Sequence, residues 1–296
     1  MLNKEKISDN KSTFSDVMQL FFMGFTKGSL VTRASAAAYN LFLALIPSVI
    51  FLFTLIPFVP MKNFQPELLA MIYDFIPESV YQVLESTIID VVTQKSGILL
   101  LIMFMATIIF SSNGIHALIS AFNISQHSFE TRTWLTQRFV SIVLVALISV
   151  MLLLSVGLII FSKIGINYLV KIQIIEVNIT YYILLVGRWL IVTSLVFFAV
   201  SFLYYLAPAK KTSWRFFSWG SAMTTLMIII SALVFSFYVN HFGQYNKLYG
   251  SIGTLMVVLL WLYLISISLI IGFEMNVATN INRNGQNVQT DRNIDE

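Results

Sequence analysis

Long apolar runs separated by shorter polar segments dominate the chain. Six of these runs can cross a bilayer, because about 20 helical residues rising about 1.5 Å each span about 30 Å of hydrocarbon. The pattern therefore predicts an all-α fold, a polytopic membrane helix bundle with about six transmembrane helices. The predicted spans are Ala34–Val59, Gly97–Ala117, Phe139–Ser162, Tyr181–Ala207, Phe217–Asn240 and Gly250–Glu274.

The segments outside the spans predict three further parts of the fold. Residues 13–27 place apolar side chains at i, i+3, i+4 spacing, which predicts an amphipathic helix either on the cytoplasmic membrane surface or against the bundle. Residues 61–96 predict one or two external amphipathic helices, which either cap the bundle or bind a ligand. The polar end of the chain predicts a disordered tail. The expected division is an N-terminal segment 1–33, a transmembrane domain 34–279 and a tail 280–296.

Lysine and arginine residues predict the orientation of the bundle, because they are enriched in cytoplasmic loops. Of the 18 residues, 12 lie in the N-terminal segment, the second and fourth loops and the tail, and five lie in the other loops. Arg188 lies inside a span. We therefore expect a multi-pass protein of the cytoplasmic cell membrane with both termini in the cytoplasm.

Composition supports a membrane protein and excludes several chemistries. The chain is 57% hydrophobic and 11% charged, whereas soluble domains carry about 25% charged residues. It has no cysteine, which excludes thiolate catalysis and Cys-ligated zinc or iron–sulfur clusters. Its 3 histidines lie far apart in the sequence. We therefore expect no cofactor and no bound metal, and because the basic residues flank apolar runs, we expect no nucleic-acid partner.

Arg188 is the one charged residue placed well inside a predicted span. A charge at that depth is costly and marks a functional candidate, but an arginine is long enough to extend to the headgroups. The two interpretations, a residue that lines a polar cavity and one that reaches the interface or a structural partner, remain open. Acids of the first external loop are its nearest expected partners.

The first two spans contain residues that disturb a regular apolar helix. Pro47 lies near the middle of the first span and predicts a kink. Asn40 lies about two helical turns before Pro47. It either lines a pathway or makes an interhelical hydrogen bond. In the second span, the polar and small residues Ser111–Gly114 must face protein or water, and they allow a break in the helix, which is expected to continue along the inner interface.

Several polar residues are expected at one depth, the cytoplasmic interface. Arg33 and Arg138 begin spans, Glu274 ends one, and the second loop adds three more. They form either a set of ion pairs that locks helix ends together or a site for a substrate or lipid headgroup. The second-loop members are Asn123, Glu130 and Arg132.

Three segments carry a family resemblance. The first is Arg33–Tyr39 with Ala44–Pro47. The second is Ala117–Asn123 with Glu130, Arg132 and Arg138. The third is Tyr249–Gly253 with Leu259–Tyr263 and Gly272–Asn276, and it ends on Asn276. The chain resembles the YihY/BrkB family of bacterial inner-membrane proteins from about residue 20 to 280. The resemblance implies a six-helix protein of the cytoplasmic membrane. Its activity is poorly defined, and some relatives carry a ribonuclease label and others a virulence label.

The residues favour a function other than catalysis. Phosphodiester cleavage needs clustered carboxylates or histidines that hold metal ions, or a positioned acid–base pair. The sequence predicts neither, so we expect no enzyme. We expect transport, or the handling of an anionic lipid or envelope precursor, because arginine-rich interfaces suit phosphate groups. The alternative is a structural or partner-binding membrane scaffold, which the amphipathic segments motivate.

Overall fold

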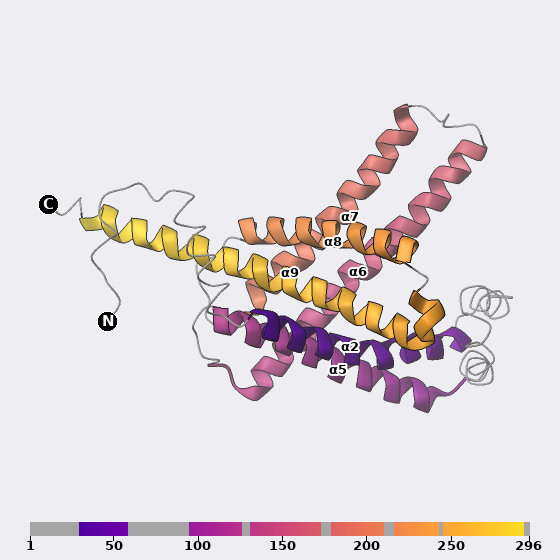
Figure 1. The fold of residues 1–296 in the computed structure, drawn as a ribbon, viewed down its shortest axis with the longest axis horizontal. Coiled ribbons are helices and arrows are strands. Elements are labelled where there is room, and N and C mark those ends of the chain that lie inside the picture. Colours follow the sequence, from indigo (N-terminus) through magenta and orange to yellow (C-terminus); the bar gives the residue numbers. More distant parts are fainter. Residues whose placement is uncertain are drawn as a thin grey trace.

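The computed structural model describes residues 30–58, 95–125, 131–172, 179–209, 216–242 and 245–292. These ranges hold six long helices and a short 3-10 turn, η1 (Ile56–Phe58), and no strand (Figure 1). All six helices are long and apolar enough to cross a membrane. The predicted all-α polytopic fold is thus confirmed. The helices are α2 (Leu30–Leu55), α5 (Gly97–Ser125), α6 (Trp134–Lys171), α7 (Ile179–Leu206), α8 (Trp219–Phe242) and α9 (Tyr245–Arg292).

The helices extend past several of the predicted ends. α5 continues to Ser125 and α6 begins at Trp134, because polar residues at a membrane interface can remain helical while leaving the apolar run. α9 continues to Arg292, so the disorder predicted for the tail is wrong for residues 280–292. A helix that is already nucleated extends through polar residues at low cost. The predicted helix at 13–27, nearly all of the external segment 61–96 and residues 293–296 lie outside the described ranges.

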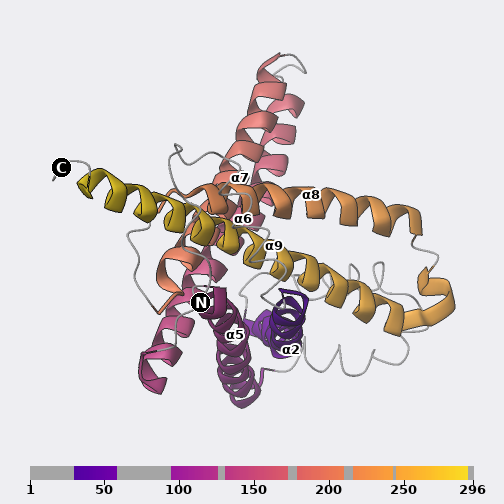
Figure 2. The same cartoon turned by 60° about the vertical axis from the view of Figure 1, so that its left-hand side comes forward.

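The helices form two groups that diverge. α2 packs on α5 and α9, and α8 packs on α9. α6 and α7 pack on each other as an antiparallel pair, here called the α6–α7 hairpin, and this pair contacts α5 and α8. Figures 1 and 2 both show the hairpin running away from α2, α5, α8 and α9 toward the α6–α7 connection. The two groups therefore meet mainly at one end of the bundle.

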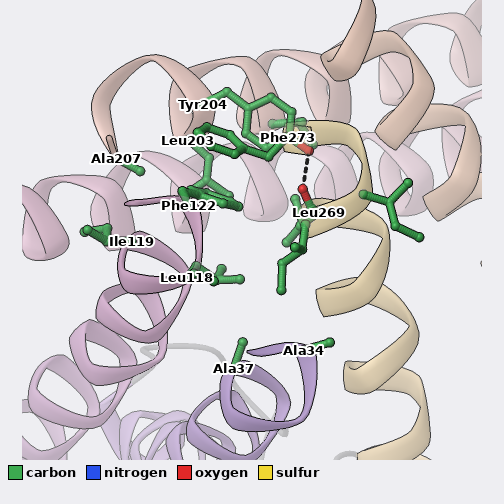
Figure 3. Close-up of a cluster of buried hydrophobic side chains, with 14 of the residues drawn as sticks. Ala34, Ala37, Leu118, Ile119, Phe122, Leu203, Tyr204, Ala207, Leu269 and Phe273 are labelled. Atoms are coloured by element: carbon green, nitrogen blue, oxygen red, sulfur yellow. Dashed lines mark hydrogen bonds between the residues drawn. The ribbon is translucent and has the colours of Figure 1, made fainter. Parts of the chain in front are cut away.

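That end contains the core of the described structure. We call it the Arg33 end; it comprises the start of α2, the end of α5, the start of α6, the end of α7, the start of α8 and the Glu274 region of α9. Phe122 and Phe273 stack there with ring centroids 4.2 Å apart, and both side chains are 0% exposed. Small residues of α2, among them Ala34 and Ala37, are fully buried beside Leu118 (Figure 3). Small side chains allow this close approach of helices.

Among the residues that the structure describes, the opposite half of the bundle has far fewer buried side chains. On the α6–α7 hairpin, Leu153, Phe161 and Ile183 are 68%, 74% and 61% exposed. Apolar exposure of this kind is normal where a helix faces lipid. The hairpin therefore presents a large part of its surface to the bilayer, while the Arg33 end is closed by packing.

The structure corrects the predicted break in the second span. α5 is one continuous helix through Ser111–Gly114. Gly114 is buried, and a Cβ atom there would lie 2.7 Å from Cδ2 of Leu41 in α2. These small and polar residues therefore serve contact with neighbouring helices. Pro47 is buried within α2, which is also continuous; the kink stays a prediction.

Candidate functional site

A buried ion pair joins the start of α2 to α9 at the Arg33 end. Nη2 of Arg33 donates a hydrogen bond to Oε1 of Glu274 over 2.8 Å, and the two side chains are 5% and 7% exposed. Arg33 belongs to the first turn of α2, and Glu274 follows directly after the buried Phe273. The helix packing that buries Phe273 therefore also places the carboxylate beside the guanidinium.

The end of α5 completes this buried cluster. Nη1 of Arg33 donates to Oγ of Ser125 over 2.6 Å and to the carbonyl of Ala121 over 2.9 Å. The Ser125 hydroxyl donates in turn to Oε1 of Glu274 over 2.7 Å. We call Arg33, Ser125 and Glu274 the three-helix polar cluster. Nε of Arg33 is buried and has no hydrogen-bond partner in the part of the chain that the structure describes.

Arg138 makes a second polar contact, between α6 and α5. Its Nη1 donates to Oγ of Ser112 and to Oδ1 of Asn113, each over 2.7 Å. Its guanidinium carbon also lies 5.9 Å from the centroid of the Trp134 ring. The polar residues that interrupt the apolar pattern of α5 thus bind an arginine of the neighbouring helix.

Other polar residues cap helix ends. Nη2 of Arg132 donates to the carbonyl of Ala207, directly after α7, over 2.8 Å, where a cation also complements the helix dipole. Oδ1 of Asn123 accepts from the backbone N–H of Ala209 over 3.0 Å. The Arg132 contact thus satisfies a carbonyl at the end of α7, where carbonyls lack an intrahelical partner, and the Asn123 contact ties the chain just after α7 to α5.

Asn276 plays the same role at the start of α8. Its Oδ1 accepts from the backbone N–H of Gly220 over 2.8 Å, and its Nδ2 donates to Oγ of Ser218 over 2.9 Å. Gly220 is needed there because a Cβ atom would overlap the backbone carbonyl of Gly272. Asn276 therefore fixes α8 against α9.

The structure thus divides the predicted polar residues among several contacts. It brings Arg33 and Glu274 together, but it places Arg132, Arg138 and Asn123 in separate hydrogen bonds. Asn40 donates to the carbonyl of Ala36 in its own helix over 2.8 Å, and among the described residues no interhelical bond is recorded for it. Glu130 lies outside the described ranges.

A buried tyrosine network was not predicted from the sequence. The Tyr204 hydroxyl lies 2.5 Å from Oγ1 of Thr224 and donates to the carbonyl of Leu269 over 2.6 Å (Figure 3). Tyr204 is 2% exposed and lies between α8 and α9. The signal available in the sequence was Gly272, whose lack of a side chain makes room for Thr224.

Arg188 lies away from the Arg33 end, on the diverging part of α7. The residue is half-buried, and its guanidinium carbon lies 5.6 Å from the centroid of the Trp189 ring. Its Nε is buried without a hydrogen-bond partner among the described residues. A shallow apolar groove lined by Tyr182, Ile183, Val186, Gly187 and Leu190 lies on the other face of α7 by helical periodicity. The arginine does not line it.

Glu274 is the only acidic side chain that the structure describes, and no group of three His, Asp or Glu side chains comes together in the described ranges. The polar groups at the Arg33 end mostly satisfy one another, which makes this end a sealed, cross-linked layer. Arg188 differs because the described residues give this cation no ion pair and leave its Nε without a hydrogen-bond partner.

The fold defines a multi-pass helical membrane protein. A family model described as Virulence factor BrkB matches residues 21–294, and the chain belongs to this family. A Bacillus subtilis protein named as ribonuclease-like, YfkH, is 29% identical over 86% of this chain and 92% of its own length. The UPF0761 membrane protein NTHI0384 of Haemophilus influenzae is 22% identical over 91% of this chain and 96% of its own length. No solved structure matches the chain.

Proposed function

We propose that the protein moves or handles an anionic lipid or lipid-linked envelope precursor in the cytoplasmic membrane, with the Arg33 end and both termini on the cytoplasmic side. One observation carries the proposal: the bundle is sealed by polar contacts at the Arg33 end and diverges at the other. A protein that exposes a substrate to one side at a time needs such a difference between its two ends. The orientation rests on the excess of lysine and arginine in the segments at the Arg33 end.

A lipidic substrate fits the diverging half better than a soluble one. The exposed side chains there are almost all apolar, as with Leu153 and Phe161, and a water-soluble molecule gains nothing from such a surface. A lipid keeps its acyl chains in hydrocarbon beside these residues. Only its headgroup then needs a polar partner, and Arg188 offers a cation at this half of the bundle.

Transport also suits the residues better than nuclease activity. The ribonuclease-like name belongs to the Bacillus subtilis relative. In the described part of this chain, the carboxylate of Glu274 is neutralised by Arg33, and a general base or metal ligand needs a carboxylate that is free to act. The polar layer at the Arg33 end therefore supports a closed gate in preference to a catalytic centre. The segments that motivate the scaffold alternative lie outside the described ranges.

Reconstituted vesicles test this proposal. Purified full-length protein is inserted into liposomes that contain a trace of fluorescent phosphatidylglycerol, and an impermeant reductant bleaches the label in the outer leaflet. We expect protein-containing vesicles to lose the fluorescence of the inner leaflet within minutes, while protein-free vesicles retain about half of the label. Retention of half of the label in vesicles that contain folded protein would contradict lipid movement.

A further inference from the structure

Arg188 is a cation inside a membrane helix without a matching acid in any neighbouring span. The sequences of α2, α5, α6, α7 and α8 contain no Asp or Glu. The carboxylate of Glu274 in α9 is already bound by Arg33 and Ser125 at the other end of the bundle. Arg188 is the tenth residue of α7, so it lies about 14 Å along the axis from the start of that helix. The described residues of α7 offer no acid between the start of the helix and Arg188.

The surroundings of Arg188 suit a phosphate at the edge of the hairpin. Helical periodicity places Arg188 on the same face of α7 as the buried Val192, and Nε of the arginine is itself buried. The guanidinium extends toward Trp189, which is 57% exposed. Arg188 lies six residues inside the apolar span that begins at Tyr182, about 9 Å along the axis, and an arginine side chain is long enough to extend from there to the headgroups. The charged tip is therefore held where a lipid headgroup can reach it.

We propose that Arg188 binds the phosphate of an anionic phospholipid in the leaflet opposite the Arg33 end, with Trp189 beside the headgroup. The inference rests on the proposed function and names its substrate class and a binding residue. A guanidinium donates two parallel hydrogen bonds to a phosphate, and this bond is strong where water is scarce. The acyl chains lie against the exposed apolar side chains of the α6–α7 hairpin. Charge complementarity thus selects an anionic lipid over a zwitterionic one.

Quenching of Trp189 by brominated lipids tests the site without any transport step. The full chain is reconstituted with brominated phosphatidylglycerol or brominated phosphatidylcholine, and the contribution of Trp189 is the difference between the wild type and Trp189→Phe. We expect half-maximal quenching at about tenfold less phosphatidylglycerol than phosphatidylcholine, equivalent to about 1.4 kcal/mol. Arg188→Gln is expected to abolish this preference, and Arg188→Lys to retain part of it because the charge remains.

Two controls separate the possible outcomes. Arg283→Gln removes one positive charge from α9 beyond the spans and should keep the preference, and Gly187→Leu fills the groove on the other face of α7 and should keep it as well. Equal quenching by both lipids in the wild type, or an unchanged preference in Arg188→Gln, would overturn the inference. Selective quenching without lipid movement in vesicles would instead contradict only the proposed function. Lipid movement that Arg188→Gln leaves intact, with no selective quenching, would contradict only this site.

Discussion

Arg33 and Glu274 are 241 positions apart in the sequence, yet they form a 2.8 Å ion pair buried among three helices. Ser125 bridges the two by accepting from Arg33 and donating to Glu274. The pair lies at the end of the bundle where the helices are closely packed. In our account this three-helix polar cluster holds the Arg33 end closed.

Removal of one charge of the pair should destabilise the bundle. Glu274→Gln leaves the Arg33 guanidinium buried without a counter-charge, which typically costs about 3–5 kcal/mol. Chemical unfolding in mixed micelles measures this loss. The double variant Arg33→Met with Glu274→Met should lose less than the two single variants together, because no unpaired charge remains. Strictly additive losses would show that the two residues are not coupled.

Gly272 should tolerate no side chain. A Cβ atom at this position overlaps Oγ1 of Thr224 and lies 2.8 Å from both the Gly220 carbonyl and the Tyr204 hydroxyl. Forcing such a contact costs about 1–3 kcal/mol, so Gly272→Ala should lower the midpoint of thermal unfolding. Gly187→Ala is the matched control, because a Cβ atom there has no neighbour within 4 Å. An equal effect of the two substitutions would contradict the close contact of α8 and α9.

The Tyr204 hydroxyl should contribute to stability, whereas the hydroxyl of the adjacent Tyr205 should not. Tyr204→Phe leaves the carbonyl of Leu269 without this donor inside the core, and an unsatisfied buried group costs about 1–3 kcal/mol. Tyr205 is 53% exposed, so Tyr205→Phe should change stability little. Thermal unfolding of the two variants in the same detergent makes the comparison. A larger loss of stability in Tyr205→Phe than in Tyr204→Phe would contradict the buried hydrogen bonds of Tyr204.

The membrane orientation can be tested because the chain has no cysteine. Thr131→Cys and Lys95→Cys each introduce a single thiol at an exposed position, one at the Arg33 end and one at the other. In intact spheroplasts, a membrane-impermeant maleimide should label Lys95→Cys and should label Thr131→Cys only after permeabilisation. The reverse pattern would invert the proposed orientation.

The sequence predicts the parts of this fold that depend on local pattern. Each span follows from an apolar run of sufficient length, and helices are the simplest way to satisfy the backbone inside a bilayer. The shared depth of Arg33 and Glu274 follows from the alternation of the spans. The structure adds that their two helices are adjacent and turn these side chains toward each other at that depth.

Contacts that depend on how each helix is rotated were not predictable. Ser125 looks like any polar residue at the end of a helix, and its place between Arg33 and Glu274 requires the relative rotation of three helices. A break at Ser111–Gly114 is absent for a related reason, although these residues do face protein as the sequence predicts. Ser112 and Asn113 are satisfied by Arg138 of α6, a partner that no single-helix pattern reveals.

Lipid movement by the protein is tested most directly by comparing two labelled lipids in the same vesicles. Initial rates of inner-leaflet bleaching are measured for fluorescent phosphatidylglycerol and phosphatidylcholine, with wild-type protein and with Arg188→Gln. We expect the wild type to move the anionic lipid several-fold faster than the zwitterionic one, and Arg188→Gln to remove this difference. If folded wild-type protein moves neither lipid faster than protein-free vesicles do, the central claim is contradicted.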